Sequence, residues 1–193
     1  MRIRFVHKKT TRTGAKEFTG YRHLNLDAKG AKQFTEVKDK DGNVTDFRDV
    51  KLKGYLSTWQ HVTPSDRDGE YVVRGAFTET IPKFMKNPVL LAGHYNSPDH
   101  AVGVFTKVVE DDQGLYVEAE LSNAPGVADY RFKVAEGVIR TLSMGGRFHR
   151  SDDGRGIVKV DLYEGSLVAI PANPDAVFTT RQQADVESME VAT

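Results

Sequence analysis

The chain has 193 residues, of which 39% are hydrophobic and 28% charged, as in an ordinary globular protein. Basic and acidic residues number 27 each, so no net charge favours a nucleic acid or an anionic membrane as partner. The absence of cysteine excludes disulfides, thiolate zinc sites and a cysteine nucleophile. No apolar run approaches the roughly 18 residues of a membrane helix, and the N-terminus lacks the apolar core of a secretory signal. We therefore expect a soluble intracellular protein with no nucleic-acid or membrane partner.

The first part of the chain differs in pattern from the rest. Residues 1–49 alternate only weakly between polar and apolar side chains and contain the turn sequence DKDGNVTD around Asp41 and Gly42. An Asp-Gly pair between extended segments is a strong signal for a β-hairpin. We expect an N-terminal extension over residues 1–49 that is β-rich or partly mobile.

From residue 50 the pattern predicts strands that are interrupted by short helices. Alternating or continuous apolar runs predict strands in DVKLKGYLSTW, EYVVRGAF and PVLLAGH, and a hairpin in AVGVFTKVVEDDQGLYVEAEL. FTETIPKFMKN has helical spacing, but Pro82 restricts it to a short or irregular helix. A longer helix is predicted in SNAPGVADYRFKVAEG, with Asn123 as N-cap, Pro125 in the first turn and Gly137 at the C-terminus.

Two more strands complete this region. VIRTLSMGGRF and IVKVDLYEGSLVAI flank the turn SDDGRG, and PANP ends the second strand. The pattern predicts a β-rich α+β domain over residues 50–178. A polar C-terminal tail follows over residues 179–193.

One predicted strand contains residues that do not suit a strand. In VIRTLSMGGRF, Ser143 and Met144 are followed by Gly145 and Gly146, and glycine weakens a strand because it loses backbone entropy and offers no side chain for packing. Two interpretations compete. Either the glycines mark a bulge or bend beside a buried hydroxyl, or Ser143 is a nucleophile and the glycines let an extended substrate come close.

A nucleophilic serine needs a base that removes its proton and a third group that orients the base. His94 is the better candidate for the base, because it ends the run PVLLAGH where a rigid strand meets a loop. His100 is the alternative. Taken alone, a histidine at a strand end is more often structural than catalytic.

Glu164 is the first candidate for the third group. An acidic side chain inside the apolar strand VDLYEGSLVAI is costly to bury without a partner, and in an alternating strand it shares a face with Leu162 and Ser166. The competing interpretation, which periodicity alone favours, is a glutamate on the solvent face of an edge strand. Further candidates for the third group are Asp161, Asp99 and His149.

No motif indicates a metal or another cofactor. The sequence lacks an HExxH motif, and the acidic turns EDDQG and SDDGRG lack the spacing of an EF-hand. GGRFHR lacks the Lys-Ser/Thr pair and the following helix of a phosphate loop. The residues by themselves indicate an α+β domain with a candidate Ser–His site.

The order of six segments resembles the prohead (capsid maturation) proteases of tailed bacteriophages, which are similar to the herpesvirus maturational protease (assemblin). These segments lie within residues 50–178 and are GYLSTW, VVRGAF, PVLLAGHYNSPDHAVGVF, DDQGLYVEAEL, VIRTLSMGGRF and VDLYEGSLVAIPANPDA. Each motif is weak by itself, but six in the same order are specific. Gly146 departs from the pattern, because the family more commonly has a bulky residue there.

The resemblance implies a mostly antiparallel, barrel-like, herpesvirus-protease-like core and a serine endopeptidase without a cofactor. Ser143 would be the nucleophile, His94 the general base and Glu164 the third member. Amides near PANPD or beside Ser143 would stabilise the oxyanion. The enzyme would work in the host cytoplasm inside the assembling procapsid, where it would cut the scaffolding segment from the major capsid protein and also cleave itself, with a dimer or higher oligomer as an option.

A different class of function stays open at this point. A non-catalytic capsid assembly or scaffolding protein of the same fold would bind partners by strand addition. The enzyme requires Ser143, His94 and Glu164 to converge, whereas the assembly protein allows them to lie on opposite faces of the domain.

Overall fold

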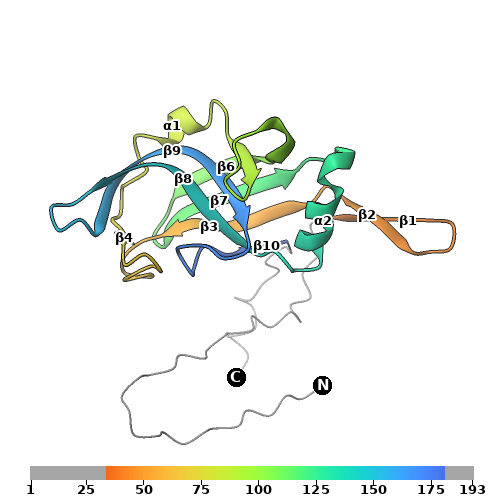
Figure 1. The fold of residues 1–193 in the computed structure, drawn as a ribbon, viewed down its shortest axis with the longest axis horizontal. Helices are drawn as coiled ribbons and strands as arrows, with labels where there is room; N and C mark the ends of the chain where they lie inside the picture. Colours follow the sequence, from red (N-terminus) through yellow and green to blue (C-terminus); the bar gives the residue numbers. More distant parts are fainter. Residues whose placement is uncertain (1–33, 181–193) are drawn as a thin grey trace, which may run out of the picture.

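A computed structural model describes residues 34–180, which form an eight-stranded sheet and a separate two-stranded hairpin (Figure 1). The strands are β1 (Thr35–Lys38), β2 (Val44–Arg48), β3 (Lys51–Thr58), β4 (Tyr71–Val72), β5 (Val89–Ala92), β6 (Ala101–Glu110), β7 (Gly114–Leu121), β8 (Thr141–Arg150), β9 (Gly156–Val168) and β10 (Phe178–Thr179). The helices are α1 (Ile81–Phe84) and α2 (Ala128–Ala135), with 3₁₀ turns at Pro98–His100 and Pro125–Val127.

The large sheet is mixed, and most of its strand pairings are antiparallel, as the resemblance implied. Its strand order is β10-β3-β7-β6-β5-β9-β4, and β8 pairs with the other edge of β9. The pairings of β9 with β4 and with β5 are parallel. The expected barrel-like core is wrong, because no closed barrel exists within residues 34–180: β4 has two residues and reaches the end of β3 through one isolated bridge, Trp59 to Val72.

Most predicted elements are present. The strand and hairpin patterns correspond to β3 and to β5–β9, and α1 is as short as Pro82 implied. The predicted N-cap of the longer helix is wrong: Asn123 accepts a hydrogen bond from the Asp49 amide and donates one to the Asp49 carboxylate, so its side chain faces the chain before β3. Gly137 has the predicted left-handed conformation, with a φ of 77°.

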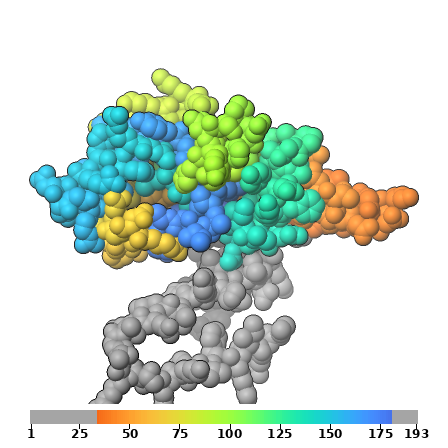
Figure 2. Space-filling model, viewed as in Figure 1, coloured from red at the N-terminus to blue at the C-terminus, as the bar shows by residue number. Residues whose placement is uncertain are grey.

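The β1–β2 hairpin turns at the predicted Asp-Gly pair and packs against α2. In Figures 1 and 2 it projects from the sheet beside that helix. Asp46 accepts hydrogen bonds from the buried guanidinium of Arg131, and the Phe47 ring packs edge-on against Phe132. Residues 1–33 and 181–193, which hold most of the expected extension and tail, lie outside the described residues.

A continuous apolar core holds β9 in place between β5 and β8. β7 shows the alternation most clearly, because Leu115, Val117, Ala119 and Leu121 are buried and the residues between them are less so. Gly165 of β9 lies against the Phe105 ring, where an added Cβ would approach within 2.5 Å. The apolar core therefore fixes the positions of β5, β8 and β9, the strands on or next to which the candidate residues lie. Within the described residues, no helix is long and apolar enough to cross a membrane.

Candidate active site

Three neighbouring strands bring the candidate residues onto one face of the sheet. β9 pairs with β5 on one edge and with β8 on the other. In the β8–β9 ladder Ser143 lies opposite Ser166, and Gly145 lies opposite Glu164. Residues directly opposite each other in an antiparallel pair project from the same face, so Ser143, Ser166 and Glu164 share a face.

His94 reaches this face through a sharp turn at the end of β5. Gly93 and His94 both have φ values of 64°, a left-handed conformation that is uncommon outside glycine. The Gly93 amide donates to the carbonyl of Leu167, and the His94 amide donates to Ser166 Oγ over 3.0 Å. The turn is therefore tied to β9 at two successive amides.

Glu164 is the partner of the His94 ring. Glu164 Oε1 lies 2.7 Å from His94 Nδ1, and Glu164 Oε2 accepts a hydrogen bond of 2.7 Å from Ser166 Oγ. The Glu164 side chain is 13% exposed and that of His94 is 41% exposed. Glu164 is thus a shielded carboxylate with two partners rather than a glutamate on a solvent face. Since Nδ1 faces Glu164, Nε2 is the ring nitrogen that remains for other chemistry.

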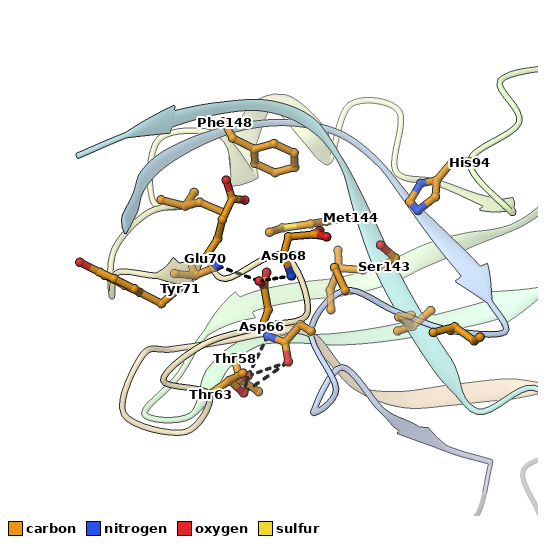
Figure 3. A pocket seen from close by; sticks show the side chains of 17 residues that line it. Thr58, Thr63, Asp66, Asp68, Glu70, Tyr71, His94, Ser143, Met144 and Phe148 are labelled. Carbon is orange, nitrogen blue, oxygen red and sulfur yellow. Dashed lines mark hydrogen bonds between the residues drawn. The ribbon is translucent and has the colours of Figure 1, made fainter. Parts of the chain in front are cut away.

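Ser143 and His94 line the same pocket, which has a volume of about 330 Å³. Figure 3 shows both side chains among those that line it. Among the described residues the Ser143 hydroxyl makes no hydrogen bond, so it is available to a ligand in the pocket. The structure records no direct hydrogen bond between Ser143 and His94 within residues 34–180.

His100, the alternative base, and His149, a candidate for the third group, have partners other than His94. His100 Nδ1 lies 2.8 Å from Ser97 Oγ, and its ring packs at a tilt against Tyr95, with 4.9 Å between centroids. His149 Nε2 lies 2.9 Å from Asp161 Oδ2, and this hydrogen bond lowers the pKa of the Asp161 carboxyl below its ordinary value. The third-group candidates Asp161 and His149 therefore bond to each other, not to His94.

Asp99, the remaining candidate for the third group, lies in the 3₁₀ turn Pro98–His100. Within the described residues it makes no hydrogen bond to His94. Glu164 is therefore the one candidate that the fold brings to this ring among residues 34–180.

Gly145 and Gly146, which follow Ser143 and Met144, make room for protein atoms of the neighbouring strand β9. A Cβ at Gly145 would lie 1.9 Å from Glu164 Oε1, and a Cβ at Gly146 would lie 2.2 Å from the carbonyl oxygen of Asp161. A register shift between Gly145 and Gly146 marks the bulge that one interpretation predicted. This internal packing accounts for the absence of a side chain at both positions, and the approach of a substrate backbone stays a prediction.

Other walls of the pocket come from segments that the sequence did not single out. Asp66, Asp68 and Glu70 line it from the loop between β3 and β4, and Met144 and Phe148 line it from β8 (Figure 3). No local signal in the sequence indicated that these residues line a pocket. Acidic residues in a turn usually face solvent, and apolar residues in a strand usually belong to the core.

A hydrogen-bonded cluster fixes the segment after β9 beside the pocket. Thr63 Oγ1 lies 2.6 Å from Thr58 Oγ1 and donates to Asp175 Oδ2 over 2.5 Å. Asn173 Nδ2 donates to Thr58 Oγ1 over 2.9 Å. The PANPD segment is therefore held against β3, and Ala172 and Asn173 line the pocket that contains Ser143.

The side chains around this arrangement do not form a metal-binding cluster within the part of the chain that the structure describes. Among residues 34–180 no three acidic or histidine side chains group closely enough to hold a metal ion. The chemistry on this face is that of a hydroxyl, an imidazole and a carboxylate.

Two curated proteins similar to this chain in sequence are prohead proteases of bacteriophages. The chain is 29% identical over 138 residues to the prohead protease of Escherichia phage T5, and 26% identical over 141 residues to that of Enterobacteria phage HK97. These alignments cover 67% and 69% of this chain and 61% of each relative, so the chain spans less than two thirds of their length.

The solved structures that resemble this chain are more distant in sequence. The capsid assembly protease of bacteriophage T4 is 9% identical, with a TM-score of 0.49 over 72% of this chain and 93% of that one. The KSHV protease in complex with a hexapeptide phosphonate inhibitor is 14% identical, with a TM-score of 0.48 over 67% of this chain and 63% of that one.

The family model of the caudovirus prohead serine proteases matches residues 34–190, most of the chain. The matched range includes the strands β5, β8 and β9. It also includes His94, Ser143 and Glu164. The chain belongs to the caudovirus prohead serine protease family.

Proposed function

We propose that this chain is a serine endopeptidase of phage head maturation, with Ser143 as nucleophile, His94 as general base and Glu164 as the group that orients the base. The observation that carries the proposal is the 2.7 Å contact between Glu164 Oε1 and His94 Nδ1 on the face that also presents Ser143. A histidine held by a shielded carboxylate beside an unbonded serine hydroxyl has the components of a serine protease. The alternative, a non-catalytic assembly protein, is not favoured, because such a protein has no need for a histidine oriented by a carboxylate near a serine hydroxyl.

The proposed reaction follows from the orientation of the imidazole. Ser143 Oγ attacks the scissile carbonyl while His94 Nε2 takes the hydroxyl proton. His94 Nδ1 donates to Glu164 Oε1, which stabilises the imidazolium that forms. The imidazolium then gives its proton to the leaving amine, and an ester joins Ser143 to the acyl fragment. Water, deprotonated by His94, hydrolyses this ester and restores the serine.

The oxyanion of the tetrahedral intermediate requires backbone N–H donors. We assign this role to the segment 170–173, because Ile170, Ala172 and Asn173 line the same pocket as Ser143 and the Thr58–Thr63–Asn173 cluster holds the segment rigidly. One such donor contributes roughly 2.7–4 kcal/mol to the stability of the transition state.

The substrates we propose are the scaffolding segment of the major capsid protein and the protease itself, within the assembling procapsid in the host cytoplasm. The segments 1–49 and 179–193 are the candidate sites of self-cleavage. After prolonged incubation, intact mass spectrometry should show wild-type protein shortened at one or both ends. A Ser143→Ala chain that shortens equally would show that another protease is responsible.

The decisive test is co-expression of the wild type and of Ser143→Ala with the cognate major capsid protein, followed by intact mass analysis of the capsid protein. Loss of a serine nucleophile lowers turnover on the order of a millionfold, so only the wild type should shorten the capsid protein. Equal processing by both variants would refute Ser143 as nucleophile. No processing by either, together with no labelling of Ser143 by a serine-directed phosphonate, would favour the assembly protein.

A further inference from the structure

The hydroxyl of Ser166 lies between the two groups that determine how His94 is placed. Ser166 is 0% exposed and stands on β9 two residues after Glu164. Its Oγ accepts the His94 amide over 3.0 Å and donates to Glu164 Oε2 over 2.7 Å. One hydroxyl is thus bonded to the backbone of the base and to the carboxylate that orients the ring.

These two bonds give the hydroxyl a defined direction. A serine hydroxyl has one proton to donate, and this proton is committed to Glu164, so the His94 amide must bond to a lone pair. The terminal torsion of a glutamate side chain is soft, so a carboxylate with one partner rotates readily. Because Oε2 is bonded to Ser166, Oε1 is held toward His94 Nδ1.

The backbone of His94 also needs this partner. Its φ of 64° is a conformation in which residues other than glycine are uncommon and which persists only where the surroundings enforce it. The bond from the His94 amide to Ser166 Oγ lies at this turn, one residue after the bond from Gly93 to Leu167. Removal of the hydroxyl would therefore free both the carboxylate and the turn that carries the imidazole.

We propose that Ser166 is a positioning residue of the protease, which sets the orientation of the His94 imidazole through Glu164 and through the His94 backbone. The inference rests on the proposed function of Ser143 and His94. Ser166 touches neither substrate nor reacting atoms, so its effect must appear as weaker activation of Ser143. A hydroxyl that only satisfied buried polar groups would contribute to stability without affecting the reactivity of Ser143.

The chain offers a matched control at Ser57. Ser57 and Ser166 are both 0% exposed and both lie in the large sheet. Ser57 Oγ, however, has no hydrogen-bond partner among the described residues. Ser57→Ala removes a buried hydroxyl of the same size from a neighbouring part of the core without touching His94 or Glu164.

The experiment measures the rate at which a fluorophosphonate labels Ser143 in the full chain, as a function of pH, in wild type, Ser57→Ala and Ser166→Ala. Peptide mapping assigns the label to Ser143, and thermal unfolding checks each variant. We expect Ser166→Ala to react roughly 10- to 100-fold more slowly than wild type, the range found for outer partners that orient metal-binding histidines. We also expect its pH profile to change in shape, and Ser57→Ala to react like wild type.

Each outcome decides something different. A wild-type labelling rate in folded Ser166→Ala would overturn the positioning role and leave the proposed protease intact. Failure of the wild type itself to label at Ser143 would overturn both. If Ser166→Ala does not fold, Ser166→Cys replaces it, because a thiol fills nearly the same space but donates only weakly. Slow labelling of Ser166→Cys supports the role, and a wild-type rate refutes it.

Discussion

Gly145 lies directly opposite Glu164 in the β8–β9 ladder, and the carboxylate of Glu164 lies over it. An added Cβ would come within 1.9 Å of Glu164 Oε1, the same oxygen that contacts His94 Nδ1. The missing side chain of one strand is therefore what allows the acidic side chain of the next to reach the histidine. This relationship explains why a glycine follows so closely after Ser143.

Gly145→Ala should reduce activity more than stability. The atoms that a new methyl group meets belong to the Glu164 side chain, whose flexible end can move aside, and Gly145 has no positive φ that would strain alanine. Displaced from His94, the carboxylate no longer orients the ring, and a misplacement of about 1 Å costs roughly 100-fold in rate. The measurement is the labelling rate of Ser143 beside thermal unfolding.

Gly126→Ala is the control for this substitution. A Cβ at Gly126 would meet nothing within 4 Å, and its φ lies outside the left-handed range. It should label at the wild-type rate. If Gly145→Ala does the same, the contact between Glu164 and His94 is unimportant for the reaction.

Glu164→Gln should impair catalysis while it preserves the fold. The amide keeps the size of the side chain but cannot stabilise an imidazolium, and its NH₂ can turn toward Nδ1 and favour the wrong tautomer. The equivalent change in a serine protease triad lowers turnover about 10⁴-fold, which sets the upper limit here. Processing of the capsid protein is the assay.

A surface glutamate shows whether charge alone matters. Glu120 of β7 pairs with Lys51 and has a side chain that is 46% exposed, so Glu120→Gln removes one negative charge outside the pocket that His94 lines. It should process normally. Normal processing by Glu164→Gln as well would remove Glu164 from the mechanism.

Thr63→Val should loosen the segment after β9. The change deletes the hydroxyl that bonds to Thr58 and Asp175 but keeps the shape of the side chain. Because Thr63 is only 4% exposed, the loss of these hydrogen bonds should lower the free energy of unfolding by about 1–3 kcal/mol. If the oxyanion donors lie in residues 170–173, the labelling rate must also fall. Urea unfolding and labelling are measured on the same sample.

Thr80→Val separates these two effects. Thr80 is also 4% exposed, and its hydroxyl accepts the Leu162 amide outside the pocket of Ser143. It should lose similar stability and keep its labelling rate. Equal labelling rates in Thr63→Val and Thr80→Val would show that the segment after β9 does not provide the oxyanion donors.

Asp46→Ala should destabilise the protein strongly, because it leaves the guanidinium of Arg131 without its carboxylate. That guanidinium is 0% exposed and makes its ion pair with Asp46 over 2.7 Å. Removal of one partner of a buried ion pair costs about 3–5 kcal/mol. Asp112→Ala, which removes an exposed ion pair with Arg74, should cost at most about 1 kcal/mol. Comparable losses in urea unfolding would refute the role of the pair in anchoring the hairpin to α2.

The same pair predicts a pH dependence of stability. Hydrogen bonds from Arg131 hold the pKa of the Asp46 carboxyl below its ordinary value. A carboxyl whose pKa is lower in the folded state stabilises the protein above its unfolded pKa of about 3.9, and this contribution is lost as the pH falls through the folded value. The difference in unfolding free energy between wild type and Asp46→Asn should therefore shrink below about pH 4. A constant difference down to pH 2 would contradict this assignment.

Local patterns in the sequence determined the elements and the identity of the candidate residues. The alternation in residues 50–58 and 101–121 predicted strands that are present, and Asp41-Gly42 marked the hairpin, because side-chain period and turn chemistry are properties of neighbouring residues. Ser143, His94 and Glu164 were selected from residue type and position, with the resemblance to a family deciding among alternatives. The cap at Asn123 was wrong, since a contact with Asp49, 74 residues away, outweighed the local capping preference.

Only the tertiary structure decided how these residues meet. Glu164 had been indistinguishable from a solvent-facing glutamate until the parallel pairing of β5 with β9 brought His94 to its carboxylate. The sheet is open and mixed instead of forming the expected barrel. Closure would depend on pairing by the two-residue strand β4, and local sequence patterns do not reveal how far such a strand pairs. The role of Gly145 likewise follows from the residue opposite it on β9. Register between strands distant in sequence is set by the whole core, so the sequence named the chemical groups and the packing placed them.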